Sequence, residues 1–471
     1  MEERRSHEAW VPLLAGLVWL VAGSSGGLLA LLLSIVPGVL LVATGAGELL
    51  WSNDRRMLQF CALAGAVGVV LAVPGLLILG FWSGLLAGLL SAGSFVVAGA
   101  LSLRGLPEVA RVPRARSGVV MAAKVAADEA VLSTMSVTRS LPRGVRASRI
   151  RVEVDEALQV FASRGWIEKP ESYHRNPLPL DAPRIRQAKS RGTAYEHLSF
   201  DSEYEPHAEE PGRNRWLGYT KNQTAHAGVL RHAGSARPWL VCIHGYQMGS
   251  PRWDLAAFDP GLVHRKLGLN LLLPVLPLHG ERSWGRRSGH GFMGSQPLDT
   301  LHAEAQAMWD IRRLLSWVRA QDAPAIGVLG LSLGGYNAAL LACLDSDLAC
   351  AIPGIPATSF ERLLFAHAHE AQAREFRKAG LTEPLLRELF RPVSPLVLEP
   401  KVAPEGRALF AGVADRLVSA DQARDLYEHW GEPPMEWYQG SHLSFLRERG
   451  VKKLIETTLR DNGVQWSPRP A

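Results

Sequence analysis

The chain has 471 residues, which is long enough for more than one structural unit. Its formal net charge is only +6, and no basic stretch is combined with aromatic residues or a recognised motif, so nothing in it indicates nucleic-acid binding. The hydrophobic fraction of 47% is ordinary but unevenly spread, because residues 9–103 are almost free of charge whereas the rest has the usual globular mixture.

Two long apolar stretches, residues 9–51 and 57–103, open the chain. Each is about twice as long as the roughly 20 residues that one membrane-spanning helix needs, so each is predicted to be a helical hairpin. The first turn is expected between Ser24 and Pro37-Gly38, and the second near Gly80 to Gly84. The sequence therefore predicts an all-α transmembrane region of about four helices at residues 9–103.

The basic residues around these stretches predict an orientation. With four spans, the three basic positions fall on one side of the membrane, namely Arg4 and Arg5, Arg55 and Arg56, and Arg104. Basic residues are enriched on the cytoplasmic side. We therefore expect a multi-pass membrane protein whose tail (1–8) and large C-terminal domain both face the cytoplasm.

Two other interpretations of the apolar region are weaker. A signal peptide would account only for the first stretch. A transporter normally keeps ionisable residues inside its spans, and Glu48 is the one candidate, expected at the interface beside Trp51. We interpret the region as an anchor.

Residues 104–191 connect this region to the next one. Helical apolar spacing occurs at 119–135 and 150–166, and a Pro-rich stretch at 168–184 is typical of a linker. The arginines of this segment fit either contact with anionic headgroups or a solvated helix face, and both interpretations stay open.

From residue 192 onward, alternating strand patterns are followed by an amphipathic helix at 301–321 and another strand–helix pair. Strands that alternate with helices predict an α/β domain with a doubly wound, mainly parallel sheet. In the last pair, Ser332 lies in the sequence Gly330-Leu331-Ser332-Leu333-Gly334 between strand and helix. This is the G-x-S-x-G pattern in the strand–turn–helix context that a nucleophile elbow requires.

On these residues, the segment 192–465 resembles the α/β-hydrolase superfamily, including its serine esterases, lipases, dienelactone-hydrolase-like and peptidase-like branches. The resemblance implies a catalytic acid and then a histidine after the serine. Asp415 follows a predicted strand, and His442 lies in a Gly-Ser-His turn before the last helix. It also implies a helical lid, which we place at about 359–396.

Competing residues for these roles are less suitable. Asp421 is expected to cap the following helix, and Asp345 and Asp347 come too early in the chain. His429 lies inside a helical stretch. The sequence therefore predicts a triad of Ser332, Asp415 and His442.

The resemblance also implies an oxyanion hole made by two backbone amides, which we assign to Leu333 and Tyr246. His244, before Tyr246, matches the family's His-Gly motif and is expected either to organise the loop or to border a pocket. His279 and Trp284 are further candidates for the pocket, with a structural role for their loop as the alternative.

No cofactor and no metal are implied, because the histidines form no H-x-x-E-H or Cys/His motif. The cysteines lie in apolar runs and are expected to be buried thiols, which fits a reducing compartment: Cys61, Cys242, Cys343 and Cys350. The predicted function is a membrane-anchored serine hydrolase of carboxylic esters, acting on lipid or other hydrophobic acyl substrates. Thioesterase, peptidase or acyltransferase activity needs the same triad, and a non-catalytic membrane scaffold is the alternative from another class.

Overall fold

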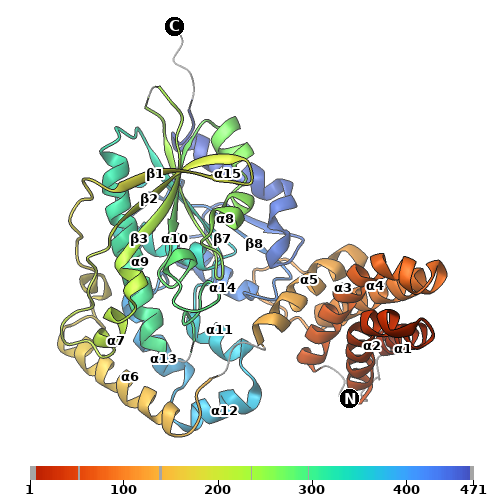
Figure 1. Cartoon of the computed structure of the whole chain (residues 1–471). Coiled ribbons are helices and arrows are strands. Elements are labelled where there is room, and N and C mark those ends of the chain that lie inside the picture. The colour runs from red at the N-terminus through yellow and green to blue at the C-terminus, as the bar shows by residue number, and fades with distance from the viewer. Residues whose placement is uncertain (1–6, 51–53, 137–140, 235, 295, 467–471) are drawn as a thin grey trace. The chain divides into compact units, whose positions relative to one another are not determined.

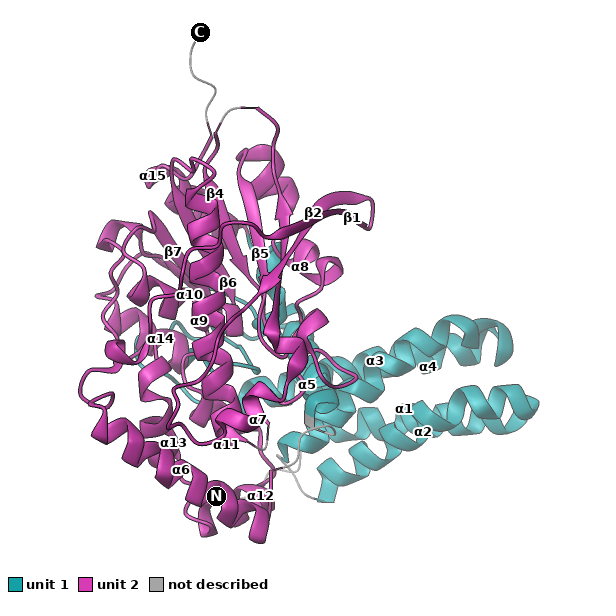
Figure 2. Cartoon of the chain, turned by 60° about the vertical axis from the view of Figure 1, so that its left-hand side comes forward, with its two compact units in different colours: residues 1–138, 412–420, 437–448 teal, residues 139–411, 421–436, 449–471 magenta. Residues whose placement is uncertain are grey.

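The computed structural model describes residues 7–50, 54–136, 141–234, 236–294 and 296–466 (Figure 1). It divides into two compact units, which Figure 2 colours separately. Unit 1 comprises residues 1–138, 412–420 and 437–448, and unit 2 comprises residues 139–411, 421–436 and 449–471. The predicted tail residues Arg4 and Arg5, as well as Trp51, lie outside the described residues.

Unit 1 is helical. Its elements are η1 (His7–Ala9), α1 (Trp10–Ser25), α2 (Gly27–Leu50), α3 (Arg55–Ile78), α4 (Phe81–Arg104), α5 (Val119–Ser136) and η8 (His442–Arg447). Within the described part of the chain, four helices are long and apolar enough to cross a membrane: His7–Ser25, Gly27–Leu50, Arg55–Ile78 and Phe81–Arg104. The helix number agrees with the prediction, and the two turns, at Gly26 and at Leu79 and Gly80, fall where the sequence places them.

Small residues allow these helices to pack closely. A Cβ atom on Gly84 of α4 would lie 2.6 Å from the backbone of Gly75 in α3, so only glycine fits there. In the same unit, the Trp19 indole N–H donates a hydrogen bond to Ser91 Oγ at 3.0 Å, which joins α1 to α4. Glu48 in α2 is buried.

Unit 2 contains the sheet domain. Its strands are β1 (Arg184–Ser190), β2 (Thr193–Asp201), β3 (Thr224–Leu230), β4 (Trp239–Ile243), β5 (Asn270–Val275), β6 (Ile326–Leu331) and β7 (Cys350–Gly354), together with parts of β8 (Leu409–Gly412) and β9 (Met435–Tyr438). Its α-helices are α6 (Val145–Ser163), α7 (Arg213–Leu217), α8 (Pro251–Ala257), α9 (Pro297–Arg319), α10 (Leu333–Leu344), α11 (Phe360–His367), α12 (Glu370–Lys378), α13 (Glu383–Phe390), α14 (Ala420–His429) and α15 (Arg449–Asp461). Short helical turns are η2 (Pro170–Tyr173), η3 (Thr220–Gln223), η4 (Gly261–Lys266), η5 (Gly280–Arg282), η6 (Arg391–Val393) and η7 (Pro404–Gly406).

The sheet has the strand order β1-β2-β3-β5-β4-β6-β7-β8-β9. The pairs β1/β2, β2/β3 and β3/β5 are antiparallel, whereas β4/β5, β4/β6, β6/β7 and β7/β8 are parallel. Strands β4, β6 and β7 are buried along their whole length, as expected where helices cover both faces of a parallel sheet. The order and the strand–turn–helix at β6 confirm the predicted α/β-hydrolase fold.

The structure bears on two predicted boundaries, namely the start of the sheet domain at residue 192 and the lid segment 359–396. Strand β1 lies before residue 192, where the strand pattern begins in the sequence, and its residues are mostly exposed, so no apolar alternation announces it. Helices α11, α12 and α13 lie in the segment 359–396, where a lid is predicted. Their action as a lid stays a prediction.

Candidate active site

Ser332 is the single residue between strand β6 and helix α10. Its backbone has φ 59° and ψ −112°, a conformation that non-glycine residues rarely adopt. The strain is held by backbone hydrogen bonds: Ser332 N donates to the Gly354 carbonyl at 2.9 Å, and the Ser332 carbonyl accepts from the amide of Tyr336 at 3.0 Å. The side chain is only partly buried, unlike its neighbours in β6 and α10.

The glycines of the motif are required by close backbone contacts. A Cβ atom on Gly330 would lie 1.8 Å from the carbonyl oxygen of Gly334, because strand and helix approach at the turn. A Cβ atom on Gly334 would lie 1.8 Å from the carbonyl oxygen of Ile243 at the end of β4. The G-x-S-x-G spacing is therefore a steric requirement of this turn.

The predicted oxyanion donors lie beside this turn. Leu333 begins α10, so its amide is among the first helix N–H groups, which have no acceptor within the helix. The loop after β4 approaches the serine, since a Cβ atom on Gly245 would lie 3.6 Å from Ser332 Cβ. Tyr246 follows in that loop. Donation of these two amides to an oxyanion stays a prediction.

Asp415 and His442 form a buried pair in unit 1. Asp415 Oδ2 lies 2.6 Å from His442 Nδ1, and Asp415 Oδ1 accepts from the amides of Leu417 and Val418 at 2.9 and 2.8 Å. The Nδ1–H donor to Asp415 leaves Nε2 of the imidazole as the atom that can accept a proton. Burial acts to lower the pKa of His442, but the carboxylates of Asp415 and Asp128 outweigh it and raise this pKa above its ordinary value.

Asp128 in α5 supports the loop that carries His442, and sequence reasoning did not find it. Its Oδ2 accepts from the backbone N–H of His442 at 2.8 Å, and its Oδ1 accepts from Ser441 Oγ and Leu443 N at 2.9 and 3.2 Å. Oδ2 also accepts from the amide of Arg416, next to Asp415, at 3.0 Å. One fully buried carboxylate therefore holds both the acid loop and the histidine loop.

Burial and the charge of Asp415 raise the pKa of Asp128, whereas the backbone N–H donors act in the opposite direction. The sequence signal for this residue was an acidic pair, Asp128-Glu129, in an apolar helical segment. Charged residues are seldom fully buried without an oppositely charged or hydrogen-bonding partner. Two adjacent acidic residues in a buried helix therefore indicate partners elsewhere in the chain.

Glu129 forms the second half of this buried network. Its Oε1 lies 2.7 Å from Arg416 Nε and 3.4 Å from Arg55 Nε, and it accepts from Ser102 Oγ at 2.6 Å. Arg55 also donates to the backbone carbonyl of Arg416 at 2.8 Å. Burial acts to raise the pKa of Glu129, but the two guanidinium groups outweigh it and hold this pKa below its ordinary value. Arg416 is thus fixed beside Asp415 from two helices.

The competing acid and histidine are engaged elsewhere. Asp421 lies in the first turn of α14 and its Oδ2 is 2.7 Å from Arg362 Nη1. His429 ends α14, and its Nε2 lies 2.9 Å from the Leu398 carbonyl oxygen. These contacts favour Asp415 and His442 over the two alternatives.

His244 and His279 are completely buried loop residues. His244 Nδ1 lies 2.8 Å from the Gly245 carbonyl and its Nε2 accepts from Leu276 N at 3.1 Å, so it joins the loops after β4 and β5. Burial lowers the pKa of His244 to about 4 and that of His279 to about 3. Both are therefore neutral near pH 7. Trp284 is half exposed and stacks on Tyr219. Contact of these three residues with a substrate stays a prediction.

Ser332 belongs to unit 2, whereas Asp415 and His442 belong to unit 1. Their joint action as a triad is therefore a proposal.

All four cysteines are free and buried, as expected from their apolar surroundings.

Solved structures to which the chain is similar at low sequence identity include esterases and an acylaminoacyl peptidase from Pyrococcus horikoshii. Acetyl xylan esterase 1 from Thermoanaerobacterium sp. is 15% identical with a TM-score of 0.44, covering 63% of this chain and 98% of its own. The acetyl xylan esterase from Paenibacillus sp. R4 is 16% identical with a TM-score of 0.42, covering 71% of this chain and 99% of its own. Est1E from Butyrivibrio proteoclasticus, solved with ferulic acid, is 14% identical with a TM-score of 0.37, covering 50% of this chain and 96% of its own.

No protein-family model matches the chain. Two Mycobacterium tuberculosis proteins, named uncharacterized protein MT2702 and uncharacterized protein Rv2627c, are each 42% identical to it over 364 residues. Each match covers 76% of this chain and 86% of the relative. The chain therefore belongs to the same family as these two Mycobacterium tuberculosis proteins.

Proposed function

We propose that the protein is a serine hydrolase that cleaves carboxylic esters through Ser332, Asp415 and His442. The observation that carries the proposal is the strained Ser332 on a β6–α10 elbow in a chain that also holds a buried Asp415–His442 pair with Nδ1 at 2.6 Å from the carboxylate. This combination of a partly exposed nucleophile with an oriented base is the arrangement that acyl transfer needs.

In the proposed reaction, His442 Nε2 accepts the Ser332 hydroxyl proton while Ser332 Oγ attacks the carbonyl carbon of the ester. The tetrahedral intermediate then collapses, the alcohol leaves with the proton returned by His442, and an acyl-enzyme forms. Water, deprotonated by the same histidine, attacks the acyl carbon and releases the acid. Asp415 keeps the proton on Nδ1 and stabilises the imidazolium.

The negative charge of each tetrahedral intermediate would be stabilised by the amides of Leu333 and Tyr246. Leu333 is supported by its place at the N-terminus of α10, where the helix dipole favours negative charge. Tyr246 is supported by the approach of its loop to Ser332. Removing one such donor typically costs about 100-fold in kcat or more.

Helices α1 to α4 would hold the α/β-hydrolase domain at a membrane, with the basic residues Arg55, Arg56 and Arg104 on the cytoplasmic side. A site kept near a bilayer encounters esters of hydrophobic acids, so we propose lipids or other hydrophobic acyl esters as substrates. A reporter fused to the C-terminus tests the orientation, and a signal from the exported side would overturn it.

The activity is tested by labelling the full-length protein, in membranes, with a fluorophosphonate that reacts with activated serines. We expect wild type to label, Ser332→Ala to lose the label, and the exposed control Ser163→Ala to label as wild type does. A folded wild type that does not label would overturn the proposal.

A panel of esters, thioesters and amides with acyl chains of increasing length then tests the substrate class. The proposal predicts the highest kcat/KM for oxygen esters of long acyl chains. Faster cleavage of thioesters or amides, or transfer of the acyl group to an added alcohol in place of water, would assign the thioesterase, peptidase or acyltransferase alternative instead.

A further inference from the structure

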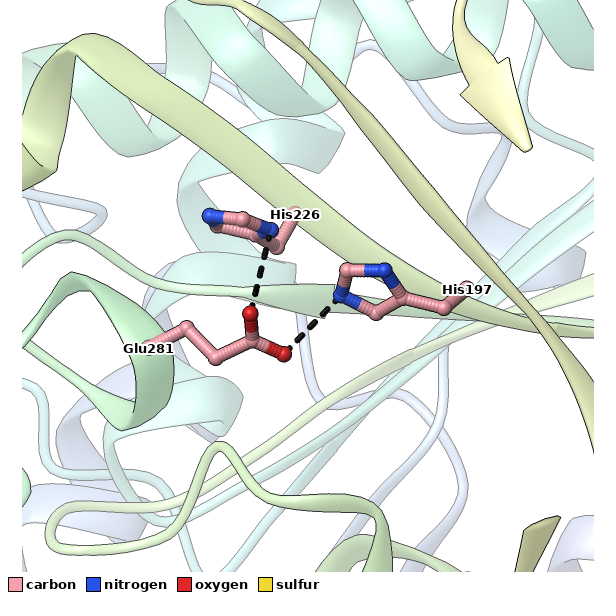
Figure 3. A group of neighbouring side chains, drawn as sticks. All are labelled: His197, His226 and Glu281. Carbon is pink, nitrogen blue, oxygen red and sulfur yellow. Dashed lines mark ion pairs between the residues drawn. The ribbon is translucent and has the colours of Figure 1, made fainter. Parts of the chain in front are cut away.

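Two histidines and one glutamate of unit 2, none of them part of the proposed triad, lie close to one another (Figure 3). His197 is on β2, His226 is on the neighbouring strand β3, and Glu281 is in the short helix η5 after β5. The antiparallel register pairs His226 with Ser199 and His197 with Gly228. The two imidazoles therefore project from the same face of the sheet as diagonal neighbours, with ring centroids 5.3 Å apart.

The side chains of this His197–His226–Glu281 cluster converge. His197 Nε2 lies 2.9 Å from Glu281 Oε1, His226 Nδ1 lies 3.7 Å from Glu281 Oε2, and one donor atom from each residue lies within 4.8 Å of the other two. Figure 3 shows both rings facing the carboxylate from the two strands. Although His197 Nε2 and His226 Nδ1 are buried atoms, neither makes a well-formed hydrogen bond within the described part of the chain.

Buried polar atoms without hydrogen bonds are uncommon and call for a partner. Two imidazole nitrogens and one carboxylate oxygen are a donor set that suits Zn²⁺, and three protein ligands leave a coordination position open. We propose that His197, His226 and Glu281 bind a zinc ion. The sequence gives no motif for this site, because its residues come from three separate elements.

A cavity of about 360 Å³ adjoins the cluster and is lined by His197 and Glu281. Its other walls are mainly apolar, including Leu230, Leu255 and Leu273. A zinc ion in the cluster is therefore next to solvent-accessible space, so water or a small ligand with an oxygen or nitrogen donor can complete the coordination.

Arg186 on the edge strand β1 contacts two residues of the same cluster. Its Nε donates to His197 Nδ1 at 2.9 Å, and its Nη2 lies 4.0 Å from Glu281 Oε2. In a zinc-bound imidazole the outer nitrogen carries a proton and acts as a donor, so the Arg186 N–H cannot donate to it. The Arg186 side chain is 69% exposed and can turn into solvent. Arg186 thus competes with the metal as a cation beside Glu281.

Zinc binding is tested on the full-length, tag-free protein in detergent after treatment with a chelator. Isothermal titration with ZnCl₂ and the visible absorption of added Co²⁺ report binding without any measurement of activity. We expect one Zn²⁺ per chain, weakened at least about tenfold by His197→Ala, His226→Ala or Glu281→Gln. The Ser332→Ala variant should bind as wild type does, which separates this proposal from the hydrolase function.

Two further variants sharpen the test. His232→Ala removes a histidine that is stacked on His264 outside the cluster, and it should leave the affinity unchanged. Arg186→Gln should tighten binding, because it removes the competing charge and its amide oxygen can accept from Nδ1–H of His197. Glu281 is half exposed, so Glu281→Gln should fold even if a variant of buried His197 does not. No stoichiometric binding by wild type, or binding that Glu281→Gln leaves unchanged, would overturn the proposal.

Discussion

Asp128 Oδ2 accepts a hydrogen bond from the backbone nitrogen of His442 at 2.8 Å, although the two residues are 314 positions apart in the chain. The same carboxylate accepts from the amide of Arg416 and from Ser441 Oγ. The loops that carry Asp415 and His442 are therefore held by helix α5, which follows the apolar helices in the chain.

Replacing Asp128 with Asn should impair catalysis through His442. The amide removes a negative charge that raises the pKa of His442, so this pKa falls and the acid limb of the kcat/KM profile moves to lower pH. The new NH₂ group also faces buried N–H donors and displaces the His442 loop at a cost of about 1–3 kcal/mol, which corresponds to about 5- to 160-fold in kcat/KM.

Glu129→Gln is the matched control for Asp128→Asn, because Glu129 is the next residue of α5 and pairs with Arg416 and Arg55. It should lower the melting temperature and leave the acid limb of the profile in place. An Asp128→Asn enzyme whose acid limb coincides with that of wild type would contradict a role in positioning and charging His442.

Asp415→Asn should lower kcat by about 10⁴-fold, since an amide cannot hold the proton on Nδ1 or stabilise the imidazolium. Asp421→Asn is the control, because Asp421 pairs with Arg362 and should tolerate the change with little loss of kcat. Steady-state kinetics on a chromogenic ester measure both. If Asp421→Asn caused the larger loss, the acid would have to be reassigned.

Gly334→Ala should prevent the elbow from forming. Its Cβ atom would lie 1.8 Å from the Ile243 carbonyl oxygen, so β4 and α10 must separate. Overpacking of this kind costs about 1–3 kcal/mol or more. Gly228→Ala is the matched control, because its Cβ atom would have only ordinary contacts, the nearest at 3.7 Å. The midpoint of thermal unfolding and the extent of fluorophosphonate labelling should both be lower in Gly334→Ala and unchanged in Gly228→Ala. Equal values for the two variants would refute the steric account.

Stability should fall as the pH is lowered from about 6.5 to about 4. Burial lowers the pKa values of His174, His244 and His302 to about 4 and that of His279 to about 3. The unfolded chain, with ordinary histidine pKa values near 6.5, binds more protons in this range, and each histidine then costs about 1.4 kcal/mol per pH unit.

The variant His302→Gln tests this pH dependence. His302 Nε2 lies 3.1 Å from the Pro211 carbonyl, and a glutamine amide can donate the same hydrogen bond without titrating. Unfolding midpoints measured from pH 7 to pH 4 should therefore depend less on pH in this variant. Identical slopes would contradict a neutral, buried His302.

Local sequence patterns determined the apolar helices and the elbow at Ser332. Hydropathy alone predicts the four helices of residues 7–104 and their turns, because a membrane-length apolar run needs no distant partner to be recognised. Likewise, the elbow is a local steric device: Gly330, Ser332 and Gly334 follow one another, and their spacing already requires the strand–turn–helix that β6 and α10 form.

Only the tertiary structure decided which distant polar groups meet. Asp128 has no motif, and its role follows from hydrogen bonds to loops more than 280 residues away. His197, His226 and Glu281 converge because the register of β2 and β3 and the loop after β5 bring them to one place. Sheet pairing and buried charge networks are set by the free energy of the whole fold, so a short window of sequence does not reveal them.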